Sequence, residues 1–120
     1  LAAIDCVMRL LKPNDEVIAM DDLYGGTYRL FTKFYQDLGI KFHFIDMNDL
    51  ELFQSKINSN TKLVWIETPT NPLMKLADIK AIAEITKKNN VLFAVDNTFA
   101  TPYLQNIWVD TLMLSLVRWL

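Results

Sequence analysis

The sequence predicts an α/β fold in which a mostly parallel sheet is flanked by helices. Four short apolar runs, each the length of a strand, alternate along the chain with segments whose apolar residues recur at helical spacing. The runs are apolar along most of their length, as strands are when helices cover both faces of a parallel sheet. Turn-forming Asn, Asp, Pro and Gly residues separate the segments.

The expected strands are residues 16–21, 40–46, 62–67 and 91–96. The second of them, IKFHFID, alternates in part between apolar and polar residues, which is typical of a strand with one exposed side. We therefore expect its histidine, His43, to lie on an edge strand or half-buried rather than to bind a metal.

The expected helices are residues 1–11, 25–39, 48–57 and 77–90. Segment 25–39 carries large apolar residues on one face and has Gly39 in the stop position. The third helix is expected to begin with Asn48 as its N-cap, because Glu51 follows at the spacing of a capping box. Basic residues in the last turns of segment 77–90 suit the carboxyl end of a helix.

Composition and charge argue against several classes of partner. The 120 residues are 52% apolar and 22% charged, as in one folded domain. The net charge is -2 and the Lys and Arg residues are scattered, so there is no basic stripe for nucleic acid. No apolar run approaches the roughly 18 residues of a membrane span, and the first residues do not resemble a signal peptide. We expect a cytoplasmic protein with no nucleic-acid or membrane partner.

Cys6 is the single cysteine, so the chain cannot form an internal disulfide. Its helical spacing with Met8 and Leu10 predicts a place in the core rather than a nucleophilic role. No His, Cys, Asp and Glu pattern has the spacing of metal ligands, and we expect no metal site. The chain starts without Met inside an expected helix and stops on an apolar run, which predicts a fragment of a longer protein.

Polar residues follow three of the expected strands. The sequences are DDLYGGT, ETPTNP and DNTF. Each could be an ordinary helix start, rigid turn or cap. Together they place an aromatic ring, a carboxamide, a carboxylate and a hydroxyl on the carboxyl edge of a parallel sheet, where such sheets bind ligands.

Three motifs, MDDLYGGTYRLF, KLVWIETPTNP and VDNTFATPYLQ, closely resemble the pyridoxal-phosphate-dependent Cys/Met metabolism (transsulfuration) family in their order and separation. The resemblance covers about residues 1–106 and is altered over 107–120. It implies that residues 1–120 are part of the large domain of the fold-type I, aspartate aminotransferase-like enzymes, which bind pyridoxal 5'-phosphate. Family members are longer than this chain, and the resemblance implies a homotetrameric parent protein.

The resemblance also implies roles for residues of the three loops. Asp96 would contact the pyridine nitrogen of the cofactor and keep it protonated, which makes the ring a better electron sink. Tyr24 would stack on the ring and act in proton transfer, so it is the expected catalytic residue. Asn71 would donate to the ring hydroxyl, and Thr98 would pack against the ring. Glu67 is expected to support these residues without touching the cofactor.

The carboxyl-terminal residues depart from the family pattern, in which Ser-x-Thr-Lys carries the lysine that binds the cofactor covalently. If Asp110 aligns with the family's aspartate after a three-residue gap, Ser115 is a further cofactor-binding residue and Arg118 takes the place of the lysine. Without a gap, the lysine falls beyond Leu120. Arginine stays protonated and cannot act as an amine nucleophile. The family's phosphate loop also lies largely upstream of Leu1.

The resemblance implies γ-replacement or γ-elimination on a small amino-acid substrate such as a homoserine ester, cystathionine or methionine. We favour the cystathionine γ-synthase and γ-lyase group and rank methionine γ-lyase below it. The motifs do not distinguish synthase from lyase, and the substrate-choosing residues lie mostly outside this chain. We expect the chain alone to be inactive. The alternative is a non-catalytic α/β remnant or a partial cofactor-binding module.

Overall fold

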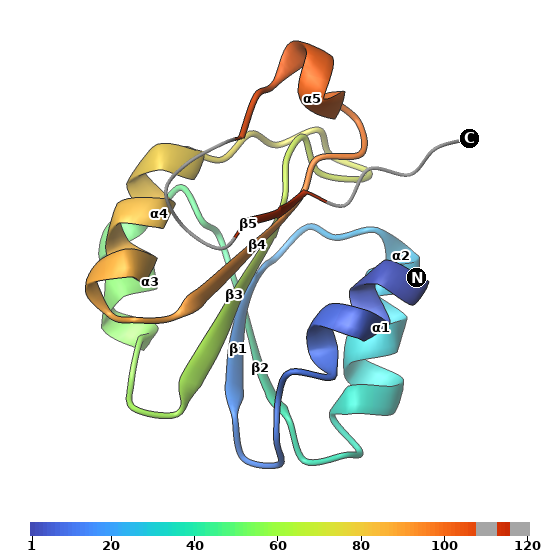
Figure 1. Ribbon diagram of the computed structural model, residues 1–120, viewed down its shortest axis with the longest axis vertical. Coiled ribbons are helices and arrows are strands. Elements are labelled where there is room, and N and C mark those ends of the chain that lie inside the picture. The colour runs from blue at the N-terminus through green and yellow to red at the C-terminus, as the bar shows by residue number, and fades with distance from the viewer. Residues whose placement is uncertain (108–112, 116–120) are drawn as a thin grey trace.

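A parallel sheet with strand order β2-β1-β3-β4-β5 forms the centre of the molecule (Figure 1). The computed structural model describes residues 1–107 and 113–115. Every strand pair within these residues is parallel, which confirms the expected fold class. The first four strands match the expected runs and the fifth is an addition. The strands are β1 (Glu16–Met20), β2 (Lys41–Ile45), β3 (Thr61–Glu67), β4 (Leu92–Asp96) and β5 (Met113–Ser115).

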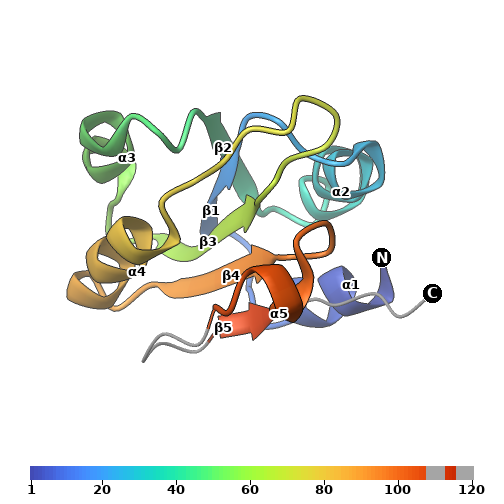
Figure 2. The same cartoon turned by 90° about the horizontal axis from the view of Figure 1, so that it is seen from above.

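Helices cover both faces of the sheet, with α1 and α2 on one face and α3 and α4 on the other (Figure 2). The chain moves from β1 to the edge strand β2 through α2, and then in the opposite direction across the sheet to reach β3 and β4. Because the crossovers are right-handed, this reversal places α2 on the opposite face from α3 and α4. None of the described helices is long and apolar enough to cross a membrane. The helices are α1 (Ala2–Met8), α2 (Gly25–Leu30), the π-helical turn η1 (Phe31–Tyr35), α3 (Leu50–Lys56), α4 (Ile79–Lys88) and α5 (Thr101–Leu104).

The central strands are buried and the edge strand is not. All five residues of β1 are buried, whereas Ile45 is the buried residue of β2. His43 lies half-buried on this edge strand, as expected, and its Nε2 lies 2.8 Å from Glu16 Oε2. Among the described residues, no group of three or more His, Cys, Asp and Glu side chains could hold a metal ion.

The start of α3 differs from the expectation by one residue. Asp49, not Asn48, is the N-cap, and its Oδ1 accepts the Leu52 N–H at 2.9 Å. Asn48 instead donates its backbone N–H to Asp46 Oδ1 at 2.9 Å. Both residue types cap helices well, so the sequence pattern alone does not select between two neighbours.

Segment 25–39 ends at Gly39 as expected, with φ 88° in the left-handed region that favours glycine. It is not one regular helix, because α2 runs directly into the π-helical turn η1. The wider π turn changes the spacing of the apolar face. Phe31 and Tyr35 are buried, whereas Tyr28 and Phe34 are about half exposed.

The expectation that Cys6 fills the core is wrong, because its side chain is exposed. Helix α1 buries Ile4, Val7 and Met8, which follow the spacing of one helical face. Leu10, which was expected to share the core with Cys6, is also exposed, at 56%. The helix ends at Met8 and is shorter than the expected helix, so its apolar face does not extend to Leu10.

Phe31 links the helical layer to the sheet. Its ring is fully buried, stacks on Phe42 at a centroid distance of 4.8 Å, and meets Trp65 edge-on at 5.7 Å. We predict that Phe31→Ala lowers the free energy of unfolding by about 3 to 5 kcal/mol, through lost burial and the cavity left behind. The measurement is the urea unfolding midpoint.

Phe34→Ala is the matched control, since Phe34 lies in the same turn but is 49% exposed and contacts the Tyr35 ring. This control should lose about 1 kcal/mol. Equal losses from the two substitutions would contradict the packing described for Phe31.

Candidate functional site

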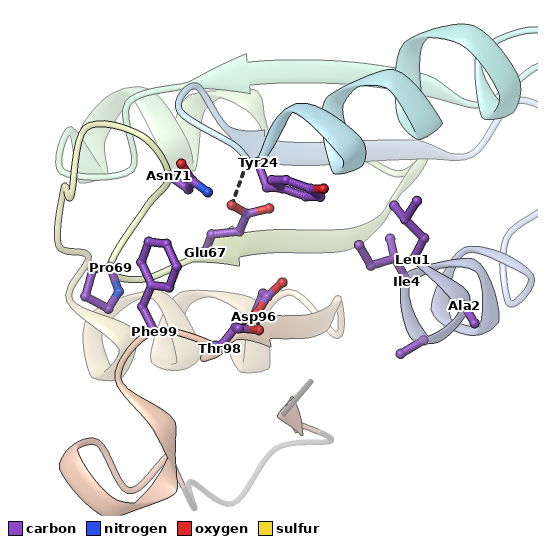
Figure 3. A pocket seen from close by; sticks show the side chains of 11 residues that line it. Leu1, Ala2, Ile4, Tyr24, Glu67, Pro69, Asn71, Asp96, Thr98 and Phe99 are labelled. Atoms are coloured by element: carbon purple, nitrogen blue, oxygen red, sulfur yellow. Dashed lines mark hydrogen bonds between the residues drawn. The ribbon is translucent and has the colours of Figure 1, made fainter. Parts of the chain in front are cut away.

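A cavity of about 560 Å³ lies at the carboxyl ends of the strands (Figure 3). The chain leaves β1 and β3 toward opposite sides of the sheet, and open α/β sheets bind ligands at such a switch point. The walls come from α1, the start of α2 and the loops after β3 and β4. The lining residues are Leu1, Ala2, Ala3, Ile4, Tyr24, Glu67, Pro69, Asn71, Asp96, Thr98 and Phe99.

Tyr24 is the residue just before α2; it is 46% exposed and its side chain lines the cavity. Its backbone N–H donates to Glu67 Oε2 at 2.7 Å, which fixes the start of α2 to the end of β3. A Cβ at Gly26 would collide with Tyr24 Cε1, so a larger residue there would displace the ring. The absence of a side chain at Gly26 lets α2 approach the tyrosine ring closely.

Asn71 lies in a loop that side chains tie to the end of β1. The buried carboxylate of Asp22 accepts the Thr70 hydroxyl and the Leu73 N–H, the latter at 2.9 Å. Thr70 Oγ1 in turn accepts the Lys75 N–H at 2.8 Å. These bonds replace regular secondary structure and hold Asn71 at the cavity wall.

Lys75 points away from the cavity. Its Nζ lies 2.9 Å from Asp21 Oδ2 and 3.6 Å from Asp46 Oδ2. The hydrogen bond to Asp21 is the largest of the effects that raise the pKa of Lys75, so the amine stays protonated and is a poor nucleophile. In the described part of the chain, no lysine or arginine lines the cavity.

Asp96 is the last residue of β4, and its side chain lies beside that of Thr98 (Figure 3). Asp96 Oδ1 accepts the Thr98 N–H at 3.0 Å and also the Thr98 hydroxyl. These two donors orient the carboxylate at the cavity wall.

The loop after Asp96 is held by a pair of amide side chains. Asn97 is fully buried, and its Nδ2 donates to the Gln105 carbonyl at 2.9 Å. Gln105 Nε2 donates back to Asn97 Oδ1 at 3.2 Å. Because both ends of the loop are joined, Thr98 and Phe99 keep their positions at the cavity.

Glu67 lies among the lining residues, and its expected place behind the residues that touch the cofactor stays a prediction. It is 4% exposed and pairs across the sheet with Asp96. The pKa of Glu67 is raised to about 7, chiefly by burial; the nearby Tyr24 N–H and Thr27 hydroxyl lower it, and the charges of Asp96 and Asp22 add to the increase. This group therefore titrates near neutral pH. The signal for this site residue in the sequence was that one expected strand ends in Glu67 and the next ends in Asp96.

The structure brings together most of the residues expected at the site. Tyr24, Asn71, Asp96 and Thr98 all line the one cavity. Ser115 lies in β5 opposite Val95, so its backbone is near the same sheet edge. The alignment of Asp110 and Arg118 falls outside the described residues. Phe99, Pro69 and the aliphatic start of α1 were missed, because their chemistry gives no signal in the sequence.

Comparison with known proteins identifies the relatives of the chain. The family model for Cys/Met metabolism PLP-dependent enzymes matches residues 1–116. The chain belongs to this family. Cys/Met metabolism relatives include cystathionine γ-synthase/O-acetylhomoserine (thiol)-lyase of Bacillus subtilis, 54% identical over 105 residues, which are 88% of this chain and 28% of that protein.

Cystathionine γ-lyase of Dictyostelium discoideum is 44% identical over 123 residues, covering 100% of this chain and 32% of the relative. The crystal structure of cystathionine γ-lyase from Lactobacillus plantarum complexed with L-serine superposes with a TM-score of 0.84 at 41% identity, over 85% of this chain and 27% of that one. The chain thus spans about a third or less of the length of these relatives.

The cavity fits the cofactor of the Cys/Met metabolism family. Its volume is in the range of about 300 to 1,000 Å³ that small-molecule sites occupy. An exposed aromatic ring, a carboxylate and a carboxamide, from Tyr24, Asp96 and Asn71, suit a flat ring with a basic nitrogen and a hydroxyl. Glu67 Oε1 is buried without a hydrogen-bond partner. The described lining has no cationic side chain for the phosphate.

Asp22 is predicted to hold the loop that carries Asn71. Asp22→Ala removes the acceptor of the Leu73 N–H, so hydrogen exchange at the Leu73 amide should speed up by about tenfold or more. The control is Asp21→Ala, which removes a neighbouring carboxylate that contacts the same loop only through the Lys75 ammonium. If both variants exchange Leu73 at the same rate, Asp22 does not hold the loop.

Proposed function

We propose that the whole protein containing this chain is a pyridoxal-phosphate-dependent transsulfuration enzyme of the cystathionine γ-synthase and γ-lyase type. It would carry out γ-replacement or γ-elimination on a small sulfur amino acid or a homoserine ester. The observation that carries the proposal is the convergence of Tyr24, Asn71 and Asp96 on one cavity in a chain of the Cys/Met metabolism family. The functions named for its relatives support it.

The cofactor, when bound, supplies an electron sink that stabilises negative charge developing on the substrate carbon. Asp96 has the role of keeping the ring nitrogen protonated, because an adjacent carboxylate favours the charged form of a basic nitrogen. The two donors of Thr98 support this role by orienting the carboxylate. Thr98 itself packs against the ring.

Tyr24 combines two roles in this proposal. Its ring lines the cavity next to Gly26 of α2 and would stack on the cofactor. Its hydroxyl moves a proton at the substrate, and Tyr24 is the catalytic residue of the described chain. Asn71 would hold the cofactor through its carboxamide, and Ser115 would be a further cofactor-binding residue. Residues 1–120 thus form part of a cofactor-binding large domain.

The proposed partner is a small amino-acid substrate, and the whole protein is proposed to be a cytoplasmic homotetramer that binds neither nucleic acid nor membrane. A net charge of -2 without a basic stripe supports the absence of a nucleic-acid partner. Methionine γ-lyase ranks below the cystathionine enzymes, since the relatives cited above are cystathionine enzymes.

A non-catalytic cofactor-binding module is the second candidate. It is favoured by the described lining, which contains no lysine, and by the alignment that puts Arg118 in place of the family lysine. The test is to add pyridoxal phosphate and then cystathionine or a homoserine ester to the whole protein and to follow keto-acid release. Cofactor attachment to one lysine, mapped after borohydride reduction, together with turnover supports the enzyme. Cofactor binding without attachment to a lysine and without turnover supports the non-catalytic module.

Asp96→Asn is predicted to lower kcat of the whole protein by several orders of magnitude, because the amide keeps the shape but loses the charge that holds the ring nitrogen protonated. Steady-state keto-acid release at saturating cofactor measures this. Asp37→Asn, at an exposed position beyond η1, is the control and should match the parent. Near-normal turnover of the Asp96 variant would overturn the role of Asp96.

Tyr24→Phe is predicted to lower kcat by a larger factor than it lowers cofactor affinity, because the stacking ring remains and only the hydroxyl is lost. Affinity is measured by fluorescence titration with pyridoxal phosphate. Tyr28→Phe is the matched control, since Tyr28 is 48% exposed on α2 and its ring contacts Phe44. The opposite order of effects would make Tyr24 a binding residue only.

A further inference from the structure

Glu67 lies in the cavity, yet the proposed function assigns it no role. It is the last residue of β3 and is paired in register with Asp96 on β4. Its Oε2 accepts the Tyr24 N–H at 2.7 Å, and its Oε1 is buried without a hydrogen-bond partner. A buried carboxyl with one bonded and one unbonded oxygen calls for a physical account.

The bonded oxygen fixes Tyr24. Tyr24 is the N-cap of α2 but makes no side-chain cap hydrogen bond. In a capping box the N-cap N–H is bound by a side chain of the helix's own first turn, whereas here the acceptor comes from a strand 43 residues away. The position of the Tyr24 ring therefore depends on the carboxyl group of Glu67.

The surroundings of the unbonded oxygen, Oε1, favour the neutral, protonated form of Glu67. The groups that face Glu67 are Asp96 from β4, Asp22 after β1 and Thr27 from α2, while α1 contributes aliphatic side chains to the cavity. Two of these groups are carboxylates, and no cationic side chain lines the described cavity. A charged Glu67 would be buried next to like charge, which disfavours its anionic form. Since Oε2 accepts the Tyr24 N–H, the proton belongs on Oε1.

We propose that Glu67 is a positioning residue of this site, whose neutral carboxyl group fixes Tyr24 and adds no second negative charge beside Asp96. The inference rests on the proposed function only for the identity of the bound molecule. The anchoring and the protonation are properties of the chain itself.

Three variants separate these properties. Glu67→Gln keeps a neutral group with an acceptor for Tyr24 and a donor on the other atom, Glu67→Ala removes both, and Glu84→Gln is an exposed control on α4. The probe is the Tyr24 amide resonance of protein labelled with ¹⁵N-tyrosine, identified by its loss in Tyr24→Phe. It is followed from pH 5 to 9, without cofactor.

In the parent and in Glu84→Gln, the Tyr24 amide shift should titrate with a midpoint near the pKa of about 7. In Glu67→Gln, the Tyr24 amide shift should not change with pH. Hydrogen exchange at this amide should be about tenfold faster than in the parent in Glu67→Ala, and unchanged in the other two variants. A flat parent profile would overturn the neutral carboxyl. Unchanged exchange in Glu67→Ala would overturn the anchoring.

Stability gives a second readout. The pKa of Glu67 is raised from 4.5, so its contribution to stability is present below pH 4.5 and is lost as pH rises to about 7. The unfolding equilibrium constant of the parent should therefore rise relative to that of Glu67→Gln as the pH rises through this window. The ratio of the two constants should grow by up to about two orders of magnitude and then level off. A pH-independent difference would contradict the proposal.

Cofactor binding gives the third readout in the whole protein. Glu67→Gln should bind pyridoxal phosphate within about threefold of the parent, and Glu67→Ala should bind it at least about tenfold more weakly, because Tyr24 is no longer held. Equal affinity of the two variants would overturn the positioning role. If the parent itself does not bind, the proposed function fails while the amide titration still decides the state of Glu67.

Discussion

The parallel pairing of β3 with β4 is the constraint on which the cavity depends. The two strands end together, with Glu67 opposite Asp96, and the Thr68 N–H extends the ladder to the Asp96 carbonyl at 3.2 Å. Paired residues in adjacent parallel strands project from the same face, so both carboxyl groups enter one space. The loops that carry Asn71 and Thr98 start from neighbouring points for the same reason.

Side-chain hydrogen bonds, rather than regular structure, hold the two loops that leave these strands. A buried carboxylate, Asp22, organises the loop after β3, and the amide pair of Asn97 and Gln105 closes the loop after β4. Buried polar groups of this kind are favourable only when their partners are in place. The site is therefore rigid to the extent that these few bonds are complete.

The sequence predicted what depends on local pattern and missed what depends on packing. Apolar runs were enough for four strands, and the three loop motifs were enough to bring Tyr24, Asn71 and Asp96 to one edge. The exposure of Cys6 and the π turn at Phe31 follow from how far a helix extends and how it meets the sheet, which residue spacing does not encode. The place of Glu67 required the strand register, because a one-residue shift would turn its side chain to the other face.

The bonds from Asp22 to the loop after β3 have a mechanical consequence. They join the chain after β1 to the chain after β3, and the Lys75 contacts with Asp21 and Asp46 add the end of β2 to the same unit. These segments are thereby cross-linked into one wall of the cavity. The opposite side of the cavity is formed by the aliphatic first turn of α1 and by the loop that bears Phe99, and neither of them is part of this cross-linked unit.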